Sequence, residues 1–177
     1  MNRPAATGLA IGLAISGLLL VGAGHAGYRI NTTSSMPRGV WRVASAPARL
    51  ARGMIVIACQ PAGAIAQTAL RRGYVDPGTC ASGLEPLLKP IAAVAGDVVQ
   101  ITAMGILVNG FLLPRSTGLL HDSAGRSLQP APPGKYEVGP RQVWLVAPMA
   151  ASFDSRYFGA VPVSAIQGIA RPVWVFE

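Results

Sequence analysis

Lysine is the residue type most informative about chemistry in this 177-residue chain. Only two of the 15 basic residues are lysines, Lys89 and Lys135, and the others are arginines. Burial can lower the pKa of a lysine until it acts as a general base near neutral pH, whereas an arginine stays charged. Lys135 lies in a polar stretch, while Lys89 lies among the apolar residues Leu88 and Ile91. Lys89 is therefore either a candidate base or a lysine that buries its stem and extends its amine to solvent.

A cluster of hydroxyl side chains lies near the start of the chain. Residues 31–41 read Asn-Thr-Thr-Ser-Ser-Met-Pro-Arg-Gly-Val-Trp, with Ser35 directly before Met-Pro. A serine hydroxyl becomes a good nucleophile only when a neighbouring base takes its proton. A Thr/Ser-rich segment at this place is also typical of a linker, and both interpretations stay open on this segment alone.

Other catalytic chemistries have few candidate residues. The two histidines are His25, at the end of an apolar segment, and His121, in a polar stretch, so a Ser-His-Asp triad would depend on His121 alone. No spacing of Cys and His residues matches a zinc site. The chain has seven acidic residues, and no local spacing selects a catalytic pair among them. We therefore expect no metal and no cofactor.

The two cysteines are Cys59 and Cys80. In an oxidising compartment they are expected to form one disulfide, which would close a loop of about 20 residues and contribute roughly 3 kcal/mol. The alternative is a pair of buried free thiols. A cysteine nucleophile is excluded if the two residues pair.

The N-terminal 27 residues differ from the rest of the chain. Arg3 precedes a stretch, residues 5–27, that contains no Asp, Glu, Lys or Arg. This stretch is long enough to cross a bilayer as a helix, which predicts a membrane anchor at residues 1–27. A cleaved secretory signal is the alternative, with residues 24–26 as the cleavage site. On either interpretation, the remaining domain, residues 28–177, is exported.

The composition limits the partners of that domain. The whole chain has a formal net charge of +8, but its basic residues are scattered instead of forming one run. We therefore expect no nucleic acid as a partner and favour an exported basic domain near an anionic membrane surface. The 177 residues show no internal repeat and no second domain boundary.

After residue 27 the sequence consists of short apolar runs separated by Gly and Pro, which is typical of a β domain. The expected strands are 39–43, 54–59, 97–102, 105–108, 111–113 and 142–146, with a C-terminal pair around 166–175. Asn109-Gly110 predicts a tight hairpin turn. One short helix is expected at 64–72, between the cysteines, and a long surface loop at 120–136. The fold class is thus mainly β, with an N-terminal transmembrane helix and one short helical insertion.

Three segments, taken in order, resemble a known family. They are residues 31–41, residues 89–97 (Lys-Pro-Ile-Ala-Ala-Val-Ala-Gly-Asp), and residues 152–161 (Ser-Phe-Asp-Ser-Arg-Tyr-Phe-Gly-Ala-Val). Together they are similar to type I signal peptidases, the S26 family, which use a Ser/Lys dyad. The short chain, the Ser-x-Pro-Arg-Gly motif and the Lys-Pro motif resemble more narrowly the TraF-type conjugative-transfer peptidases. The resemblance implies a compact signal-peptidase-like β domain.

The resemblance also implies roles for single residues. Ser35 matches the nucleophile and Lys89 matches the general base. Thr33 matches a residue whose hydroxyl, with the backbone N–H of Ser35, forms the oxyanion hole.

The third segment matches residues that support the dyad. Ser152 matches a hydroxyl that orients the lysine, and Asp154 and Arg156 match a supporting pair. Two features depart from general signal peptidases: Thr33 stands where serine is common, and residues 146–151 replace an Asn-Arg-Asp stretch. These departures affect the support of the site and leave the dyad intact.

The function implied by the resemblance is a membrane-anchored serine endopeptidase. Its partners would be the lipid bilayer and a membrane-associated precursor peptide, either a pilin subunit or a secretory preprotein. It would lie in the bacterial inner membrane with its catalytic domain on the periplasmic face, and the family implies a cyclic product for some pilins. The alternatives are a general type I signal peptidase and a non-catalytic anchored β domain of a pilus or secretion assembly.

Overall fold

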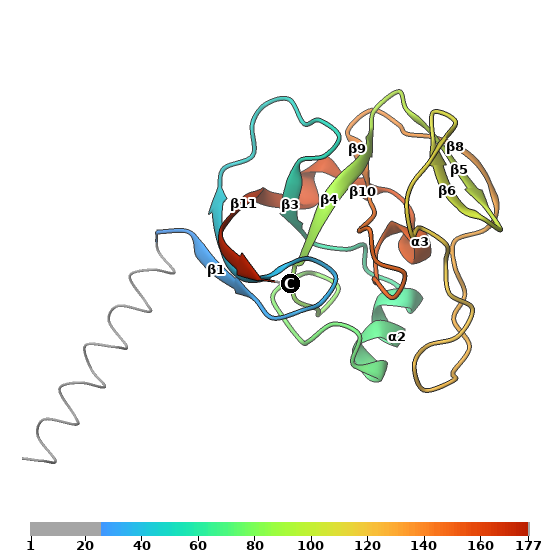
Figure 1. The fold of residues 1–177 in the computed structure, drawn as a ribbon, viewed down its shortest axis with the longest axis horizontal. Coiled ribbons are helices and arrows are strands. Elements are labelled where there is room, and N and C mark those ends of the chain that lie inside the picture. Colours follow the sequence, from blue (N-terminus) through green and yellow to red (C-terminus); the bar gives the residue numbers. More distant parts are fainter. Residues whose placement is uncertain (1–25, 177) are drawn as a thin grey trace, which may run out of the picture.

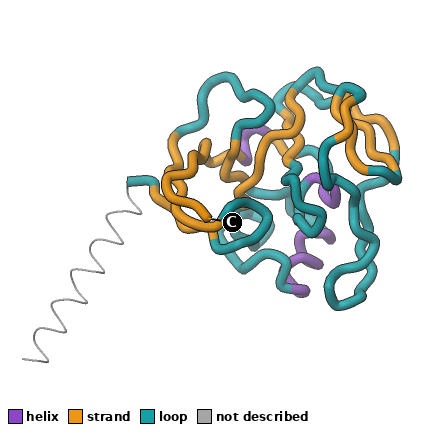
Figure 2. The backbone as a smooth tube through the Cα atoms, viewed as in Figure 1, coloured by secondary structure: helices purple, strands orange, loops and turns teal. Residues whose placement is uncertain are grey.

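A computed structural model describes residues 26–176 of the chain (Figure 1). Strands dominate, and the helices are few and short (Figure 2). The predicted anchor at residues 1–27 falls almost wholly outside the described residues and stays a prediction. No helix within residues 26–176 combines the length and the apolar character that spanning a membrane requires.

The larger sheet has seven strands, and each neighbouring pair is antiparallel. In spatial order they are β1 (Tyr28–Asn31), β2 (Arg38–Ala44), β11 (Ile166–Phe176), β3 (Ile55–Ala58), β4 (Leu87–Val94), β9 (Gln142–Leu145) and β10 (Val161–Pro162). Strand β4 therefore lies inside the sheet, while β1 forms one of its edges.

The smaller sheet has four strands and lies at the opposite end of the molecule from β1 (Figure 1). Its order is β7 (Phe111–Leu112), β6 (Gly105–Val108), β5 (Val98–Thr102) and β8 (Gly134–Glu137). Asn109 and Gly110 join β6 to β7 with φ angles of 50° and 86°. Positive φ at both central residues is what a tight hairpin turn requires, so the predicted hairpin is confirmed.

Helix α2 (Ala64–Arg72) confirms the predicted short helix and buries Ala66 and Ala69. It ends at Gly73, whose left-handed φ of 67° lets the backbone turn and return hydrogen bonds to the last helical carbonyls. Two further short elements follow later in the chain, α3 (Ser155–Phe158) and the 3₁₀ turn η1 (Val163–Ala165).

Several elements differ from the sequence-based expectations. The C-terminal pair is wrong, because β11 is one long strand that pairs with β2 and β3, and a bulge at 172–174 bends it without a turn. Strand β8 begins inside the expected loop at 120–136 and pairs with β5. Strands β1, β4 and β10 and helix α3 were not among the expected elements; β1 and β10 are short edge strands with weak sequence signals.

Apolar side chains from both sheets fill the space between them. One cluster joins the smaller sheet to the β4–β9 end of the larger one and includes Val99, Ile106 and Trp144. A second cluster contains Met36, Trp41 and Leu88, and it anchors the loop after β1 to the larger sheet. Burying a side chain such as Met36 stabilises the fold by about 1.5–3 kcal/mol, which holds this loop in place.

Candidate active site

Lys89 is the third residue of β4, opposite Val56 of β3. Only 4% of its surface is exposed, because strands lie on both sides of β4 and apolar clusters cover the sheet. The alternative of a lysine that extends its amine to solvent is therefore wrong. Lys135, in contrast, is exposed on β8.

Ser35 lies in the loop between β1 and β2, and the side chain of Asn31 shapes that loop. The Asn31 amide donates to the carbonyl oxygens of Thr33, Met36 and Pro37, each at 3.0 Å. Its own side-chain oxygen accepts from the backbone N–H and the hydroxyl of Thr33. Sequence reasoning gave Asn31 no role, although it opens the segment that carries Ser35.

The fold brings Ser35 and Lys89 together across 54 positions of sequence. Nζ of Lys89 lies 2.5 Å from Oγ of Ser35, within hydrogen-bond distance. A neutral amine at this position accepts the hydroxyl proton, which is the geometry that a Ser/Lys dyad needs.

The surroundings of Lys89 favour the neutral amine. Burial lowers its pKa from 10.5 to about 8, because an ammonium in an apolar site loses its hydration. The negative charge of Asp154 opposes this shift, and the positive charge of Arg156 adds to it. A useful fraction of the amine is therefore unprotonated close to neutral pH.

Thr33 lies beside Ser35. Its hydroxyl oxygen is 3.4 Å from Oγ of Ser35 and donates to the side-chain oxygen of Asn31 at 2.8 Å. Thr33 itself is exposed, so a substrate carbonyl can reach it.

Ser152 lines the same cleft as Lys89, and 1% of it is exposed. Its hydroxyl has no hydrogen-bond partner within the described part of the chain. A buried hydroxyl without a partner is costly, and this one is available to a group that enters or moves within the cleft.

Asp154 and Arg156 form a fully buried ion pair under the cleft. Two guanidinium nitrogens of Arg156 donate to the Asp154 carboxylate at 2.8 and 2.7 Å. Arg156 also donates to the carbonyl oxygens of Arg115, Ala147 and Ala150. The pair thus ties the connection between β9 and α3, which carries Ser152, to the loop that contains Arg115.

Next to Ser35 and Lys89 is a cleft of about 230 Å³. It is lined by residues from separate parts of the chain: Thr33, Ser34, Ser35, Tyr74, Lys89, Leu119, Asp122, Ser123, Leu128, Ala151, Ser152, Phe153 and Tyr157. Within residues 26–176 no three His, Cys, Asp or Glu side chains come close enough together to hold a metal ion.

One wall of the cleft is polar and was missed by sequence reasoning. Tyr74 donates its hydroxyl hydrogen to Asp122, and Arg126 pairs with the same carboxylate at 2.7 Å. The Tyr74 hydrogen bond, with those from Arg126 and Ala124, holds the pKa of Asp122 well below its usual range. The sequence gave little indication of this wall, because Asp122 and Arg126 are 48 or more residues away from Tyr74. The one local signal was that Tyr74 directly follows the predicted helix.

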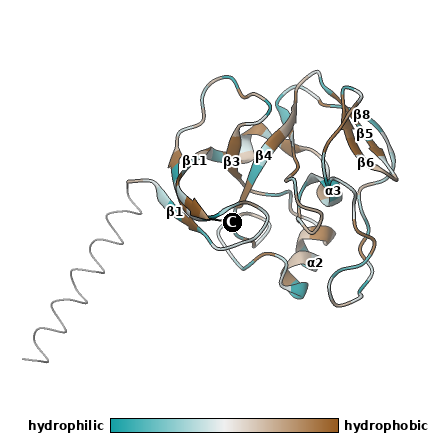
Figure 3. Ribbon diagram, in the orientation of Figure 1, coloured by the Kyte–Doolittle hydropathy of each residue, from teal (hydrophilic) through white to brown (hydrophobic). Residues whose placement is uncertain are grey.

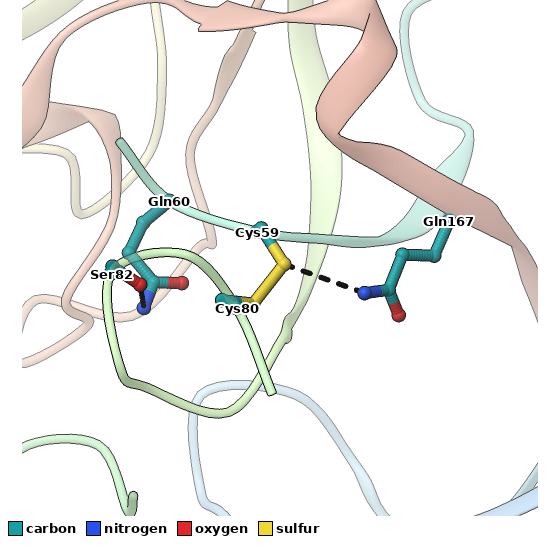
Figure 4. Close-up of a disulfide and its surroundings, with 5 residues drawn as sticks. All are labelled: Cys59, Gln60, Cys80, Ser82 and Gln167. Carbon is teal, nitrogen blue, oxygen red and sulfur yellow. Dashed lines mark hydrogen bonds between the residues drawn. A yellow bond between two sulfur atoms is a disulfide. The ribbon is translucent and has the colours of Figure 1, made fainter. Parts of the chain in front are cut away.

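The predicted disulfide is confirmed. Cys59 and Cys80 are bonded (Figure 4). The loop between them contains α2 and Tyr74. The Gln167 amide donates to the sulfur of Cys59 at 3.4 Å, and Gln60 donates to Ser82 beside the bond. The disulfide therefore restrains the segment that supplies one wall of the cleft.

Comparison with known proteins identifies the class. The family model for signal peptidase, peptidase S26, matches residues 4–175, and the chain belongs to this family. It is 39% identical to the conjugal transfer protein TraF of Agrobacterium fabrum, over 94% of this chain and 92% of that protein. It is 38% identical to a plasmid transfer protein TraF of Escherichia coli, over 93% of this chain and 94% of that protein.

A solved structure is also similar to part of the chain. It is a signal peptidase I from Enterococcus faecalis, with 16% identity and a TM-score of 0.38. The match covers 71% of this chain and 98% of that one.

Proposed function

We propose that this protein is a membrane-anchored serine endopeptidase in which Lys89 activates Ser35, and that it processes an exported precursor during conjugation. The observation that carries the proposal is the 2.5 Å contact between Nζ of the buried Lys89 and Oγ of Ser35. Membership of the peptidase S26 family and the TraF names of the relatives support the same reaction class and the same process.

The reaction begins with the neutral amine of Lys89. It takes the proton of Ser35 while Oγ attacks the carbonyl carbon of the scissile bond. The negative oxygen that develops is stabilised by the backbone N–H of Ser35 and by the hydroxyl of Thr33, which turns its hydrogen from Asn31 toward the oxyanion. The Lys89 ammonium then gives its proton to the leaving amine, and an acyl-enzyme remains on Ser35.

The second half of the reaction releases the acyl group. A water molecule activated by Lys89 hydrolyses the ester and gives a linear product. If an amine of the same substrate chain attacks instead, the product is a cyclic peptide. The exposed side of the Ser35 loop gives either attacking group access.

We propose that the substrate binds as an extended peptide, because its backbone can pair with an exposed strand beside Ser35. Strand β1 is an edge of the larger sheet and ends at Asn31, four residues before Ser35. The expected substrate is a pilin precursor, held by a bilayer in which residues 1–27 are the anchor. In this arrangement the catalytic domain faces the periplasm from the bacterial inner membrane.

The test is the intact mass of a candidate pilin precursor encoded on the same genetic element. The precursor is co-expressed with the wild-type protein, with Ser35→Ala and with Lys89→Ala. We expect a mass loss with the wild type only. A further deficit of one water relative to the linear product would identify a cyclic peptide.

Two neighbouring residues supply matched controls. Ser34→Ala removes the adjacent hydroxyl, and Lys135→Ala removes the other lysine of the chain. Both should retain processing. Normal processing by Ser35→Ala or Lys89→Ala would refute the dyad. If the wild type leaves the pilin precursor unchanged but cleaves other exported precursors, the general signal peptidase is correct; if it cleaves none, the non-catalytic β domain is correct.

A further inference from the structure

Two arginines stand behind the polar wall of the cleft. We define the arginine pair as Arg72, at the end of α2, and Arg126, in the loop of residues 119–128. This loop lies beside α2 in Figure 1 and contacts it, since Arg72 donates to the carbonyl oxygen of Ser127 at 2.8 Å. Figure 3 shows hydrophilic colouring at the end of α2, where Arg71 and Arg72 lie.

The two arginines share one counter-ion. Nε of Arg126 lies 2.7 Å from the Asp122 carboxylate, and Nη1 of Arg72 lies 3.7 Å from the same oxygen. Within residues 26–176 neither arginine forms an ion pair with another acid. Hydrogen bonds keep the pKa of Asp122 low, so its charge is fixed at neutral pH. The three side chains together therefore carry one excess positive charge.

The arginine pair keeps donors that this network does not use. Within the described part of the chain, the side chain of Arg126 donates through Nε alone, and 44% of that side chain is exposed. Arg72 donates through Nη1 alone, to Tyr74 and Ser127, and 26% of its side chain is exposed. A guanidinium has five N–H donors in a planar fork that matches a carboxylate. Asp122 thus holds the arginine pair in place and leaves it able to bind a second carboxylate.

The arginine pair borders the cleft of the candidate active site. Tyr74 and Asp122, which hold the pair, line that cleft. Arg72 lines an adjacent groove of about 410 Å³ beside α2, and Leu128 and Tyr157 line both the cleft and the groove. A peptide that leaves the cleft on this side therefore passes the arginine pair.

The proposed reaction decides which part of the substrate lies there. Lys89 takes the proton of Ser35 and gives it to the leaving amine, so the segment after the scissile bond lies on the Lys89 side of Ser35. Residues 152–157 form part of that side, because the charges of Asp154 and Arg156 act on the lysine amine.

The polar wall adjoins residues 152–157. The rings of Tyr74 and Phe153 have their centroids 6.2 Å apart. The hydroxyl of Tyr157 accepts from the backbone N–H of Leu119, where the loop that carries the second arginine begins. The arginine pair is therefore on the path of the leaving segment.

We propose that the arginine pair binds a carboxylate of the precursor on the leaving-group side of the scissile bond. The carboxylate is either an acidic side chain or the carboxyl terminus of the precursor, since both present the same two oxygens. Excess positive charge and unused planar donors favour this group over an amide or an ammonium. The inference rests on the proposed function, because it uses the direction in which the amine leaves, and it adds a substrate class.

The test compares synthetic peptides that span the processing site, with the full-length protein in detergent. One series moves a single Glu along both sides of the scissile bond, with Gln at the same positions as its control. A second series has a free or an amidated carboxyl terminus. We expect kcat/KM to fall about tenfold when the bound carboxylate is replaced, mainly through KM, because a charge-assisted hydrogen bond is lost. The series that shows the fall identifies the source of the carboxylate.

Variants with a matched control assign the effect to the arginine pair. Arg72→Gln and Arg126→Gln should each reduce the preference for the carboxylate peptide. Arg71→Gln should keep it, because this exposed neighbour donates to Thr68 within α2. Arg126→Glu should prefer a Lys peptide to the Glu peptide. If a variant does not fold, the peptide series on the wild type still tests the proposal.

Binding separates this proposal from the proposed function. Ser35→Ala is titrated with a dye-labelled alanine-rich peptide that contains one Glu, and with its Gln version, and fluorescence anisotropy is measured. Tighter binding of the Glu peptide, with no precursor cleaved by the wild type, would support the arginine pair and refute the proposed function.

The opposite results overturn the inference. Equal kcat/KM for every matched peptide, with cleavage intact, would refute the arginine pair and leave the proposed function standing. A carboxylate preference that persists in both Arg→Gln variants would place the recognition elsewhere. A preference for Glu before the scissile bond would refute the assigned direction, and a preference of the wild type for Lys would make Asp122 the recognising group.

Discussion

Lys89 and Arg156 are two buried cations of one site, but their surroundings differ. Arg156 is 1% exposed and makes five side-chain hydrogen bonds, two of them to the carboxylate of Asp154. Lys89 is 4% exposed, and its one side-chain hydrogen bond described within residues 26–176 is to the neutral hydroxyl of Ser35.

This difference separates a charge that is compensated from one that is not. The charge of Arg156 is compensated by Asp154, and the group holds the Arg115 loop against the connection between β9 and α3. The charge of Lys89 is poorly compensated, so its proton is lost easily and the pKa falls to about 8. A group prepared for proton transfer is thus expected to cost stability, whereas its supporting pair should be expensive to break.

The largest expected effect is on Lys89→Met, which keeps the volume of the side chain and removes the base. Processing of the precursor should fall below detection, while the free energy of unfolding at pH 7 rises by about 3 kcal/mol, the equivalent of the lowered pKa. Because the folded-state pKa lies below the unfolded one, this penalty is complete below pH 8 and fades as the pH approaches 10.5. Urea unfolding at pH 7 and at pH 10 measures the gain in stability and its decrease at high pH. The precursor assay measures processing.

Lys135→Met is the control, since this lysine is exposed and its loss should change neither quantity. A Lys89→Met protein that is less stable than the wild type at pH 7 would contradict the view that Lys89 costs stability.

Arg156→Met tests the opposite side of the comparison. It leaves the Asp154 carboxylate buried without its partner and removes three contacts to loop carbonyls, so we expect a loss of about 3–5 kcal/mol. The free energy of unfolding in urea measures it. Arg126→Met, which breaks a more exposed ion pair, should cost much less. An equal loss of unfolding free energy in the two variants would mean that burial does not make the Asp154–Arg156 pair harder to break than an exposed pair.

The disulfide provides a restraint that touches neither buried charge. Replacing Cys59 and Cys80 together with serine should lower stability by about 3 kcal/mol, because the unfolded chain gains entropy. The folded fraction should still process the precursor. Activity assays below the unfolding transition check this, and a well-folded but inactive double variant would show that the covalent restraint is part of the chemistry.

The smallest effect is the pH dependence of the wild type. Only neutral Lys89 can take the serine proton, so kcat/KM should fall about tenfold for each pH unit below 8 and level off above it. A precursor peptide without titrating groups near the cleavage site makes the profile specific to the enzyme. A flat profile between pH 6 and pH 8 would contradict a base with the lowered pKa.

Local sequence signals predicted much of the fold. Asn109-Gly110 gave the hairpin turn, and the apolar spacing of residues 64–72 gave α2, because both are local preferences of the backbone. The single strand β11 and the strand β8 were not predicted. Their conformations depend on pairing with β2, β3 and β5, which are distant in sequence, and strand propensity depends on such neighbours.

The candidate site divides in the same way. The order of Ser35, Lys89 and Asp154-Ser155-Arg156 in the sequence was sufficient to suggest which residues form it. The Tyr74–Asp122 wall was visible only in the fold, because a side-chain contact across 48 residues leaves no local pattern. The Ser152 hydroxyl without a partner also depends on packing between distant segments. The bonds of Asn31 are local, within six residues, but they depend on a loop conformation that the sequence alone did not indicate.

The sequence by itself determined which residue types this protein has available: one lysine among apolar residues, one serine before Met-Pro, two cysteines and an uncharged N-terminal stretch. Tertiary structure decided which of these residues lie together and in what environment. The sheet buries Lys89 beside Ser35 and lowers its pKa. Distant segments bring Tyr74, Asp122 and Arg126 together at one wall of the cleft. Burial and these contacts arise from packing between distant segments, and they set the electrostatics that turn residue types into chemistry.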